Sequence, residues 1–355
     1  MTIQSQVIVI GGGIAGALSS LIFCKAKYKV IWIKNSTEFY GGIQLPPNSI
    51  RCLDKLGLKK FINQVANPIG EIRIRSPEKL SDLNTLNVEN YFTISRKSLF
   101  EILLNSLKNF KSLKIINSSI IHFKKENNYY VLLSDAGERI KANLIIGADG
   151  SSGITRKYIL GEEKLYNPKR QIHRTIIKVK PNEYSMENSI NLWIGNGWHC
   201  VIYPIDNQKL NIVLVSSVIP NFKNYNNSIL NKLSNANWSI SNSINKIDGP
   251  TYCFESIALI GDSAHPFPPH IAQGAAQTFE DSISLYSNTL KFGLTNEMLL
   301  NYSNQRSAKV KSIIEVSDYV GNILNFRDTK SFIRNKLIEF SGPMIKNYLE
   351  EIWGL

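Results

Sequence analysis

The chain has 355 residues, of which 43% are hydrophobic, so it can bury a sizeable core and wholesale disorder is excluded. Its formal net charge is +13, but the lysines are scattered rather than gathered in a stripe, and no nucleic-acid partner is predicted. The four cysteines lie far apart without a CxxC pair, which argues against a disulfide framework or a zinc site and suits a reducing cytoplasm.

The first motif lies at the N-terminus. The apolar, β-branched run 7–10 predicts a strand buried on both faces of a parallel sheet, and GGGIAG at 11–16 follows it, before a predicted helix. In such a strand–turn–helix unit, Gly11 permits the tight turn, Gly13 lets the backbone approach a pyrophosphate, and Gly16 lets the helix pack against the strand. A tight turn that binds nothing is the alternative.

The same N-terminal segment is apolar enough to suggest a membrane-spanning helix. Residues 1–24 carry no charge and are largely apolar, which is long enough for a spanning helix. No positively charged region precedes the apolar run, however, and glycines interrupt it. We therefore expect no transmembrane segment and a cytoplasmic location.

The second predicted strand, 29–33, ends on an unexpected residue. A dinucleotide-binding unit normally places an acid there, whose carboxylate accepts the ribose hydroxyl groups. Lys34 occupies the position, and Glu38 is the nearest acid. An ammonium group only donates hydrogen bonds, so either Glu38 takes over or the ribose is held more weakly.

Two further apolar runs end in Gly/Asp sequences. The run 144–146 leads into GADG at 147–150, and the run 257–260 leads into GDSAHP at 261–266. An aspartate after a strand is usually a cap or a turn residue when it occurs singly. Together with the glycine motif they make three sites at strand ends, where open α/β sheets bind ligands.

The ordered motifs GGGIAG, GADG and GDSAHPFPPHIAQGAAQ resemble the FAD-dependent class A flavoprotein monooxygenases, which have the para-hydroxybenzoate hydroxylase fold. The IQLPPN stretch at 43–48 and the segment 264–275 are similar to the salicylate and 3-hydroxybenzoate hydroxylase branch. The resemblance runs from residue 1 to roughly residue 310 and is vague between 160 and 250.

The resemblance implies a set of FAD-binding positions. The glycines would cradle the pyrophosphate, Arg96 would reach the phosphate region, and Asp149 would support both the flavin and the pyridine nucleotide. Asp262 would bind the ribityl hydroxyl groups, and the backbone after residue 273 would donate to the flavin ring. Arg96 could equally be an exposed arginine at a helix start, and Gly153 stands where the family usually has serine. The matching positions are Gly11, Gly13, Ala15, Gly16, Lys34, Gln44, Arg96, Asp149, Asp262, Gly274 and Ala275.

The sequence gives fewer indications of the substrate site than of the FAD site. Alternating runs at 175–179 and 210–215 predict antiparallel strands, and His199 and Tyr203 would face the same side of a strand between them. The resemblance places a histidine and a tyrosine near the substrate phenol, where a neutral imidazole could accept the phenolic proton. A core histidine and an ordinary sheet aromatic are the alternatives.

No metal site is expected. His265 and His270 lie in a proline-rich loop without partnering cysteines, histidines or carboxylates.

These elements predict an α/β fold: a Rossmann-type FAD-binding domain with a mixed or parallel sheet, an inserted and mostly antiparallel substrate domain, and C-terminal helices. The spacing of apolar residues from 229 to 244 also suggests that the segment 220–250 is a surface helix with loops. The apolar stripe of the last helix suggests core, a dimer contact or a peripheral membrane contact. The expected ranges are 1–70, 90–165 and 250–310 for the FAD domain, 71–89 and 166–249 for the substrate domain, and 311–355 for the helical segment.

The resemblance implies an enzyme that uses NADH or NADPH and O2 to hydroxylate a small phenol or hydroxybenzoate through a flavin C4a-hydroperoxide. Two alternatives stay open at this point. One is a flavin enzyme that acts on a quinone, an isoprenoid or another hydrophobic ring, and the other is a degenerate FAD-binding protein without turnover. The protein is expected to be a monomer or a homodimer.

Overall fold

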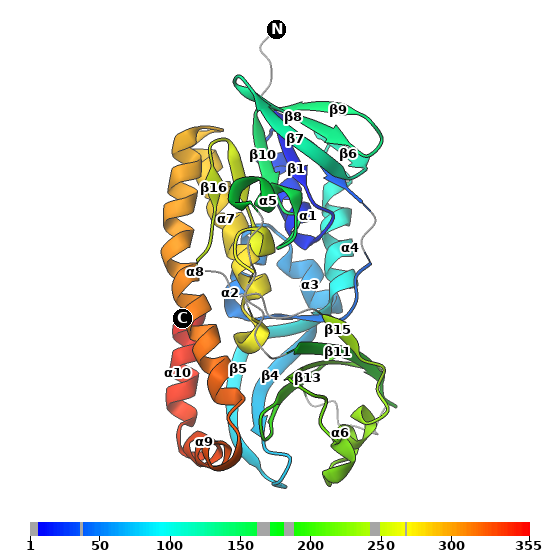
Figure 1. The fold of residues 1–355 in the computed structure, drawn as a ribbon, viewed down its shortest axis with the longest axis vertical. Helices are drawn as coiled ribbons and strands as arrows, with labels where there is room; N and C mark the ends of the chain where they lie inside the picture. The colour runs from blue at the N-terminus through cyan, green and yellow to red at the C-terminus, as the bar shows by residue number, and fades with distance from the viewer. Residues whose placement is uncertain (1–5, 36–37, 162–170, 181–187, 242–248, 267) are drawn as a thin grey trace.

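The structure is a computed structural model that describes residues 6–35, 38–161, 171–180, 188–241, 249–266 and 268–355. Two lobes are visible, one built on a six-stranded sheet and the other on an eight-stranded sheet, and a long helix runs along both (Figure 1). Phe267, within one of the motifs, and Ile244, within the expected surface helix, lie outside the described residues.

The six-stranded sheet brings the three motifs together. Its strand order is β16-β17-β10-β1-β2-β6, so the three strands that precede the motifs are neighbours. All pairs are parallel except the edge pair β16–β17. The continuous apolar runs follow from burial on both faces. The bounds are β1 Gln6–Ile10, β2 Lys29–Lys34, β6 Leu113–Asn117, β10 Leu144–Gly147, β16 Cys253–Phe254 and β17 Ile257–Leu259.

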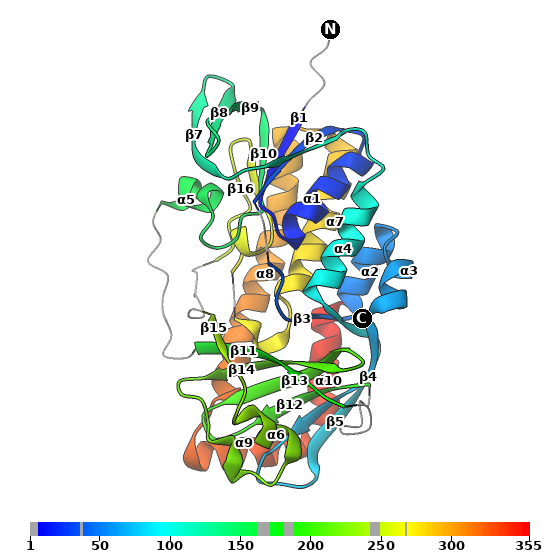
Figure 2. The same cartoon turned by 90° about the vertical axis from the view of Figure 1, so that its right-hand side faces the viewer.

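Both faces of this sheet are covered (Figure 2). Helices α1, α4 and α7 lie on one face, and a three-stranded antiparallel sheet, β7-β8-β9, lies on the other. Shorter helices α2, α3 and α5 complete the lobe. The bounds are α1 Ile14–Lys25, α2 Pro47–Lys55, α3 Lys59–Val65, α4 Arg96–Leu107, α5 Ile154–Leu160, α7 Gly274–Phe292, β7 Ile120–Glu126, β8 Tyr129–Ser134 and β9 Arg139–Ala142.

The eight-stranded sheet has the order β15-β11-β14-β13-β12-β4-β5-β3 and is antiparallel except for the pair β4–β12. Its strands come from both predicted substrate segments and extend beyond the first, because β4 begins at Asn67 and β5 ends at Ser95. The domain division itself stays a prediction. The bounds are β3 Gly42–Leu45, β4 Asn67–Arg75, β5 Asp82–Ser95, β11 Gln171–Lys178, β12 Ser189–Ile194, β13 His199–Asp206, β14 Lys209–Ser216 and β15 Ser239–Ser241.

The expected surface helix with loops, between residues 220 and 250, is present in part among the described residues. Helix α6 covers only Ser228–Leu233, after a single 3-10 turn at Phe222–Asn224, and β15 then joins the edge of the sheet next to β11. The apolar spacing that suggested one helix therefore spans two kinds of element. The predicted strands and the mixed α/β fold class are confirmed.

Three helices complete the chain. Helix α8 (Asn296–Leu324) runs along both lobes, followed by α9 (Asp328–Phe340) and α10 (Gly342–Trp353). The stripe of α10 is mostly core: Trp353 is buried against Tyr91 of β5, and Ile352 belongs to the same cluster. Apolar side chains on the outer surface of α9 and the start of α10 are exposed, namely Phe332, Ile333, Leu337, Phe340 and Met344.

The four cysteines are all free thiols. Cys24 is buried in α1, Cys52 in α2 and Cys200 in β13, whereas Cys253 is partly accessible. Burial raises the pKa of Cys52 to about 12, and burial also raises the pKa of Cys200. In the part of the chain that the structure describes, no helix is long and apolar enough to span a bilayer.

Candidate active site

One cavity of about 770 Å³ lies between the carboxyl ends of the six-stranded sheet and one face of the eight-stranded sheet. The turns after β1, β2, β10 and β17 line one side, and side chains of β11, β13 and β14 line the other. All the predicted FAD positions line this cavity except Gly16 and Lys34, and both His199 and Tyr203 line it too.

The glycine turn after β1 leaves room for a ligand. Gly11 has φ +131°, and a Cβ there would lie 2.1 Å from the carbonyl oxygen of Ala148. A Cβ on Gly16 would lie 2.0 Å from the carbonyl oxygen of Gly11, so Gly16 sets the close packing of α1 under the turn. At Gly13 a Cβ would meet nothing within 4 Å. The turn is therefore crowded below and open above, toward the cavity.

Two helix N-termini face the cavity without a cap. Helix α1 starts after Gly13 and α7 starts at Gly274, and neither has a side-chain cap or an acid in its first turn. Their first backbone N–H groups have no intrahelical partner and favour a negatively charged or hydrogen-bond-accepting ligand. A pyrophosphate at α1 and a flavin ring at α7 would satisfy both ends, so the residues present fit FAD.

The GADG turn binds protein groups as well as facing the cavity. The Asp149 carboxylate accepts from the backbone N–H of Thr155 (3.0 Å), from the Thr155 hydroxyl and from the Ser263 hydroxyl (3.3 Å). Burial raises the pKa of this carboxyl group. A Cβ on Gly153 would lie 2.2 Å from Asp149 Cγ, so glycine instead of the family's usual serine fits this arrangement.

Arg156 links the same turn to the GDS motif. Its guanidinium donates to the carbonyl oxygens of Ser263 (2.8 Å) and Ala264 (3.3 Å). Asp262, which directly precedes these two residues, is exposed and lines the cavity. Arg156 thus holds the backbone that follows Asp262 while leaving the Asp262 carboxylate available to a ligand.

The remaining predicted cofactor residues divide into two groups. Gln44 and Arg96 line the cavity; Gln44 Oε1 accepts from the hydroxyl of Tyr91 (2.8 Å), and Arg96 donates to the carbonyl of Tyr40 (3.2 Å). Lys34 does not line it, because its ammonium lies over the Trp32 ring at 5.7 Å from the centroid. The next residue, Asn35, lines the cavity instead.

His199 contacts Asn325 and His270. Its Nδ1 lies 3.0 Å from Asn325 Nδ2, which also donates to the Gly321 carbonyl (2.7 Å), so the amide group must face both acceptors with its NH2. A neutral His199 therefore carries its proton on Nε2, directed at Nδ1 of His270 (3.3 Å). A phenolic proton can reach His199 only after one of these contacts opens, and the catalytic assignment of His199 and Tyr203 stays a prediction.

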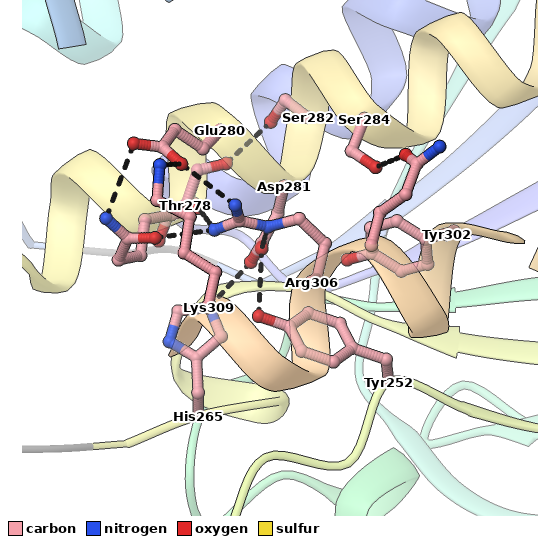
Figure 3. A network of polar contacts seen from close by, with 12 residues as sticks. Tyr252, His265, Thr278, Glu280, Asp281, Ser282, Ser284, Tyr302, Arg306 and Lys309 are labelled. Carbon is pink, nitrogen blue, oxygen red and sulfur yellow. Dashed lines mark hydrogen bonds and ion pairs between the residues drawn. The ribbon is translucent and has the colours of Figure 1, made fainter. Parts of the chain in front are cut away.

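Behind the GDS motif lies a buried ionic network (Figure 3). Asp281 Oδ2 accepts from the backbone N–H of Gly261 (3.1 Å) and from His265 Nε2 (2.6 Å). Its Oδ1 accepts from the Tyr252 hydroxyl (3.0 Å) and from Arg306 Nε (2.7 Å). Asp281 therefore fixes the start of the turn that carries Asp262.

Burial and ion pairing oppose each other in this network. Burial raises the pKa of Asp281, but His265 and Arg306 outweigh it and hold the pKa at about 2. Arg306 also pairs with Glu280 at 2.8 Å. His265 contacts Asp281, and His270 contacts His199.

Sequence reasoning missed several site residues. Arg174 lies on β11 between Ile172 and Ile176 of the same face, and strand alternation could have placed it beside the cavity. Asn325 and the Asp281–Arg306 pair carry no motif that would have revealed them. The other lining residues that were missed include Asn35, Val201, Val213, Val215 and Pro269.

Known proteins are similar to this chain in sequence and in fold. A family model described as FAD binding domain matches residues 4–224. The 3-hydroxybenzoate 6-hydroxylase 1 of Aquipseudomonas alcaligenes is 23% identical over 383 residues, covering 96% of this chain and 95% of that protein.

Two solved structures have the same fold. The crystal structure of Klebsiella pneumoniae HpxO complexed with FAD and uric acid has a TM-score of 0.87 at 16% identity, covering 99% of this chain and 97% of that one. A salicylate hydroxylase substrate complex has a TM-score of 0.77 at 19% identity, with the same coverage of 99% and 97%.

The cavity with its two uncapped helix ends, the fold and the matched family define one class of protein, the FAD-dependent flavoproteins. The chain belongs to the FAD binding domain family, and within it to the class A flavoprotein monooxygenases. The resemblance and the FAD cofactor predicted from the motifs are confirmed.

Proposed function

We propose that this FAD-dependent monooxygenase uses NAD(P)H and O2 to hydroxylate a small, electron-rich aromatic ring such as a hydroxybenzoate. The continuity of the cavity carries the proposal: the same space is lined by the turns that fit FAD and by a sheet face rich in valine. A mostly apolar pocket with a few polar groups is the usual site for a small ring.

The chemistry that FAD supplies when bound is acceptance of a hydride from NAD(P)H and activation of O2. The chain's own residues bind and orient the reactants. Val201 and Val213 would pack against the ring, and this face of the eight-stranded sheet would exclude water from it. His199 and Tyr203 border the valines and would hydrogen-bond the ring's hydroxyl group.

We place the enzyme in the cytoplasm, as a monomer or a homodimer, with NAD(P)H and O2 as diffusible partners. The buried free thiols Cys24, Cys52 and Cys200 suit a reducing compartment. The exposed apolar side chains of α9 are compatible with contact to a membrane surface or to a second copy of the chain.

The proposed reaction is tested with the FAD-loaded protein, NADH or NADPH, and a panel containing 3-hydroxybenzoate, salicylate and a lipid-soluble quinolone. We expect at least one small phenol to stimulate NAD(P)H oxidation and to yield a product carrying one 18O atom from 18O2, measured by mass spectrometry. Oxidation of NAD(P)H with only H2O2 as product would contradict the proposal. A product formed only from the quinolone would favour the hydrophobic-ring alternative.

Asp262→Ala is expected to weaken FAD binding. The change removes an exposed carboxylate that faces the cavity, and hydrogen bonds to a charged group contribute about 1.5 to 3 kcal/mol. The dissociation constant of FAD should therefore rise about 10- to 100-fold, measured by flavin fluorescence quenching. Asp206→Ala, in an exposed hairpin where Asp206 pairs with Lys209, is the control and should bind FAD normally. Unchanged flavin retention in Asp262→Ala would show that this carboxylate does not hold FAD.

A further inference from the structure

Helix α9 packs against the protein with its polar side. Arg334 is buried, and its guanidinium donates to the carbonyl oxygens of Leu324 (2.7 Å) at the end of α8 and of Gly195 (3.1 Å). The Asn335 side chain accepts from this guanidinium (2.9 Å) and donates to the Ser76 hydroxyl (3.4 Å). These contacts fix which side of the helix faces the eight-stranded lobe.

The opposite side of α9 is apolar and faces water. Phe332, Ile333, Leu337 and Phe340 are all exposed, and Phe340 is 83% exposed. A helix on the surface of a globular protein normally turns its apolar side to the core, because burial of large apolar side chains is the main favourable contribution to folding. The reversed orientation of α9 leaves that contribution available for binding to another surface.

The apolar side of α9 is part of a larger patch. Lys79, in the hairpin between β4 and β5, is ion-paired with Glu339 of α9, so the exposed Leu80 of this hairpin lies beside the helix. Met344, in the first turn of α10, is exposed as well. Helix α9 and the hairpin form the far end of the eight-stranded lobe (Figure 1, Figure 2). We call this surface the tip patch; it consists of Leu80, Phe332, Ile333, Leu337, Phe340 and Met344.

Positive charge accompanies the tip patch. Residues 327–346 contain five lysines and arginines but two acids. Lys336 lies between Phe332 and Phe340 along the helix, four residues from each, and is therefore on the apolar side. Glu339 offsets little of this charge, because it is ion-paired both with Lys336 at 3.3 Å and with the lysine of the hairpin. The patch thus combines large apolar side chains with an excess of cations.

We infer that the tip patch binds the surface of a membrane that contains anionic phospholipids. The apolar side chains would enter the boundary between headgroups and acyl chains, while the lysines extend to the lipid phosphates. The net charge of +13 attracts the whole protein to such a surface. The inference goes beyond the proposed hydroxylation and does not depend on it, because membrane binding is measured without turnover.

A second copy of the chain is the other candidate occupant, and charge disfavours it. In a two-fold symmetric pair the patch would face itself, so its lysines would approach their own counterparts. Each copy would also carry a net charge of +13. Anionic lipid headgroups instead make the same lysines attractive, and a flat bilayer can reach a patch that lies at the end of a lobe.

The test measures co-sedimentation of the whole, FAD-loaded chain with lipid vesicles. One set of vesicles is phosphatidylcholine alone, and the other is an equal mixture of phosphatidylcholine and phosphatidylglycerol. We expect the wild type to bind the mixed vesicles, and to bind the neutral vesicles at least about tenfold more weakly, since each lysine near an anionic surface contributes roughly a factor of five. Equal binding to both sets would overturn the assignment to an anionic surface.

Leu337→Gln/Phe340→Gln removes two apolar side chains from the patch and keeps residues that form helices well. Its affinity for the mixed vesicles should fall about 10- to 100-fold, because two apolar side chains no longer enter the lipid. Leu290→Gln/Leu300→Gln is the matched control, since these leucines of α7 and α8 are about as exposed as Leu337 but lie on the six-stranded lobe. The control should bind the vesicles as the wild type does.

Lys330→Gln/Lys336→Gln separates charge from apolar contact. It should weaken binding to the mixed vesicles about 10- to 30-fold and leave the weak binding to neutral vesicles unchanged. Failure of the wild type to bind the mixed vesicles would overturn the inference, as would equal binding by the wild type and Leu337→Gln/Phe340→Gln. Sedimentation equilibrium without lipid tests the other occupant: a wild-type dimer that this apolar double variant converts to monomers would assign the patch to a second copy and overturn the inference.

Discussion

Arg306→Met is expected to lower the free energy of unfolding by about 3 to 5 kcal/mol, because it leaves buried carboxylates without their cation. Arg306 pairs with Asp281 at 2.7 Å and with Glu280 at 2.8 Å, and its side chain is only 5% exposed. Urea unfolding followed by circular dichroism measures the effect. Because Asp281 also holds the N–H of Gly261, we expect FAD binding to weaken in parallel.

Lys309→Met is the matched control. Lys309 pairs with the same Glu280 at 2.7 Å, but its side chain is 43% exposed, and pairs with such exposed cations contribute about 1 kcal/mol or less. If both variants lost the same unfolding free energy, burial of the ion pairs would not explain the stability of the network.

The dependence of stability on pH in the acid range provides a second test of the same network. The folded pKa of Asp281, about 2, lies below the usual value of 3.8, so its ionisation stabilises the folded state above about pH 4. This contribution is lost as the pH falls from about 4 toward 2. In Arg306→Met the pKa of Asp281 should rise and the acid-induced loss should begin at higher pH.

Gly13→Asp is expected to abolish useful FAD binding while leaving the fold intact or slightly more stable. Gly13 has φ −85° and ψ −172°, which any residue can adopt, and a Cβ there meets nothing within 4 Å. Aspartate is a favourable N-cap, so α1 should not be weakened. Its charge would repel the pyrophosphate by about 2 to 4 kcal/mol, which raises the dissociation constant of FAD about 30- to 1000-fold.

Gly13→Asn separates charge from size in this experiment. Asparagine has the same shape and also caps helices well, but it is neutral. Titration of FAD into both variants, with thermal unfolding alongside, should show that Gly13→Asp binds FAD much more weakly at similar stability. Equal affinities for the two variants would mean that the α1 N-terminus does not hold the phosphates.

The strands that carry the motifs could be predicted from the sequence because each is short, apolar and bounded by glycine. The positions of Gly11, Gly13, Asp149 and Asp262 followed from the same turns, and the structure places all four at one cavity. The order of strands and turns along the chain was enough to predict that these turns meet, since parallel strands bring their carboxyl ends to one edge of the sheet.

The parts that could not be predicted depend on contacts between distant segments. Arg174 becomes a cavity residue only through the register of β11 with β14, and Asn325 meets His199 across 126 positions of sequence. Lys34 turned away from the cavity because Trp32 lies beside it. In the 220–250 segment the sequence could indicate a helix with loops but not its length, because part of the apolar spacing falls on an edge strand.

The buried thiols allow local opening of the two lobes to be measured by thiol labelling. Cys24 packs against the six-stranded sheet and Cys200 lies within the eight-stranded sheet, so a thiol reagent can reach each one only when its own layer separates. Each lobe therefore carries a native reporter, and pulse labelling read by peptide mass would time the two openings independently. Comparing those labelling rates with and without FAD would show whether FAD binding slows the opening of the eight-stranded lobe as well as that of the six-stranded lobe.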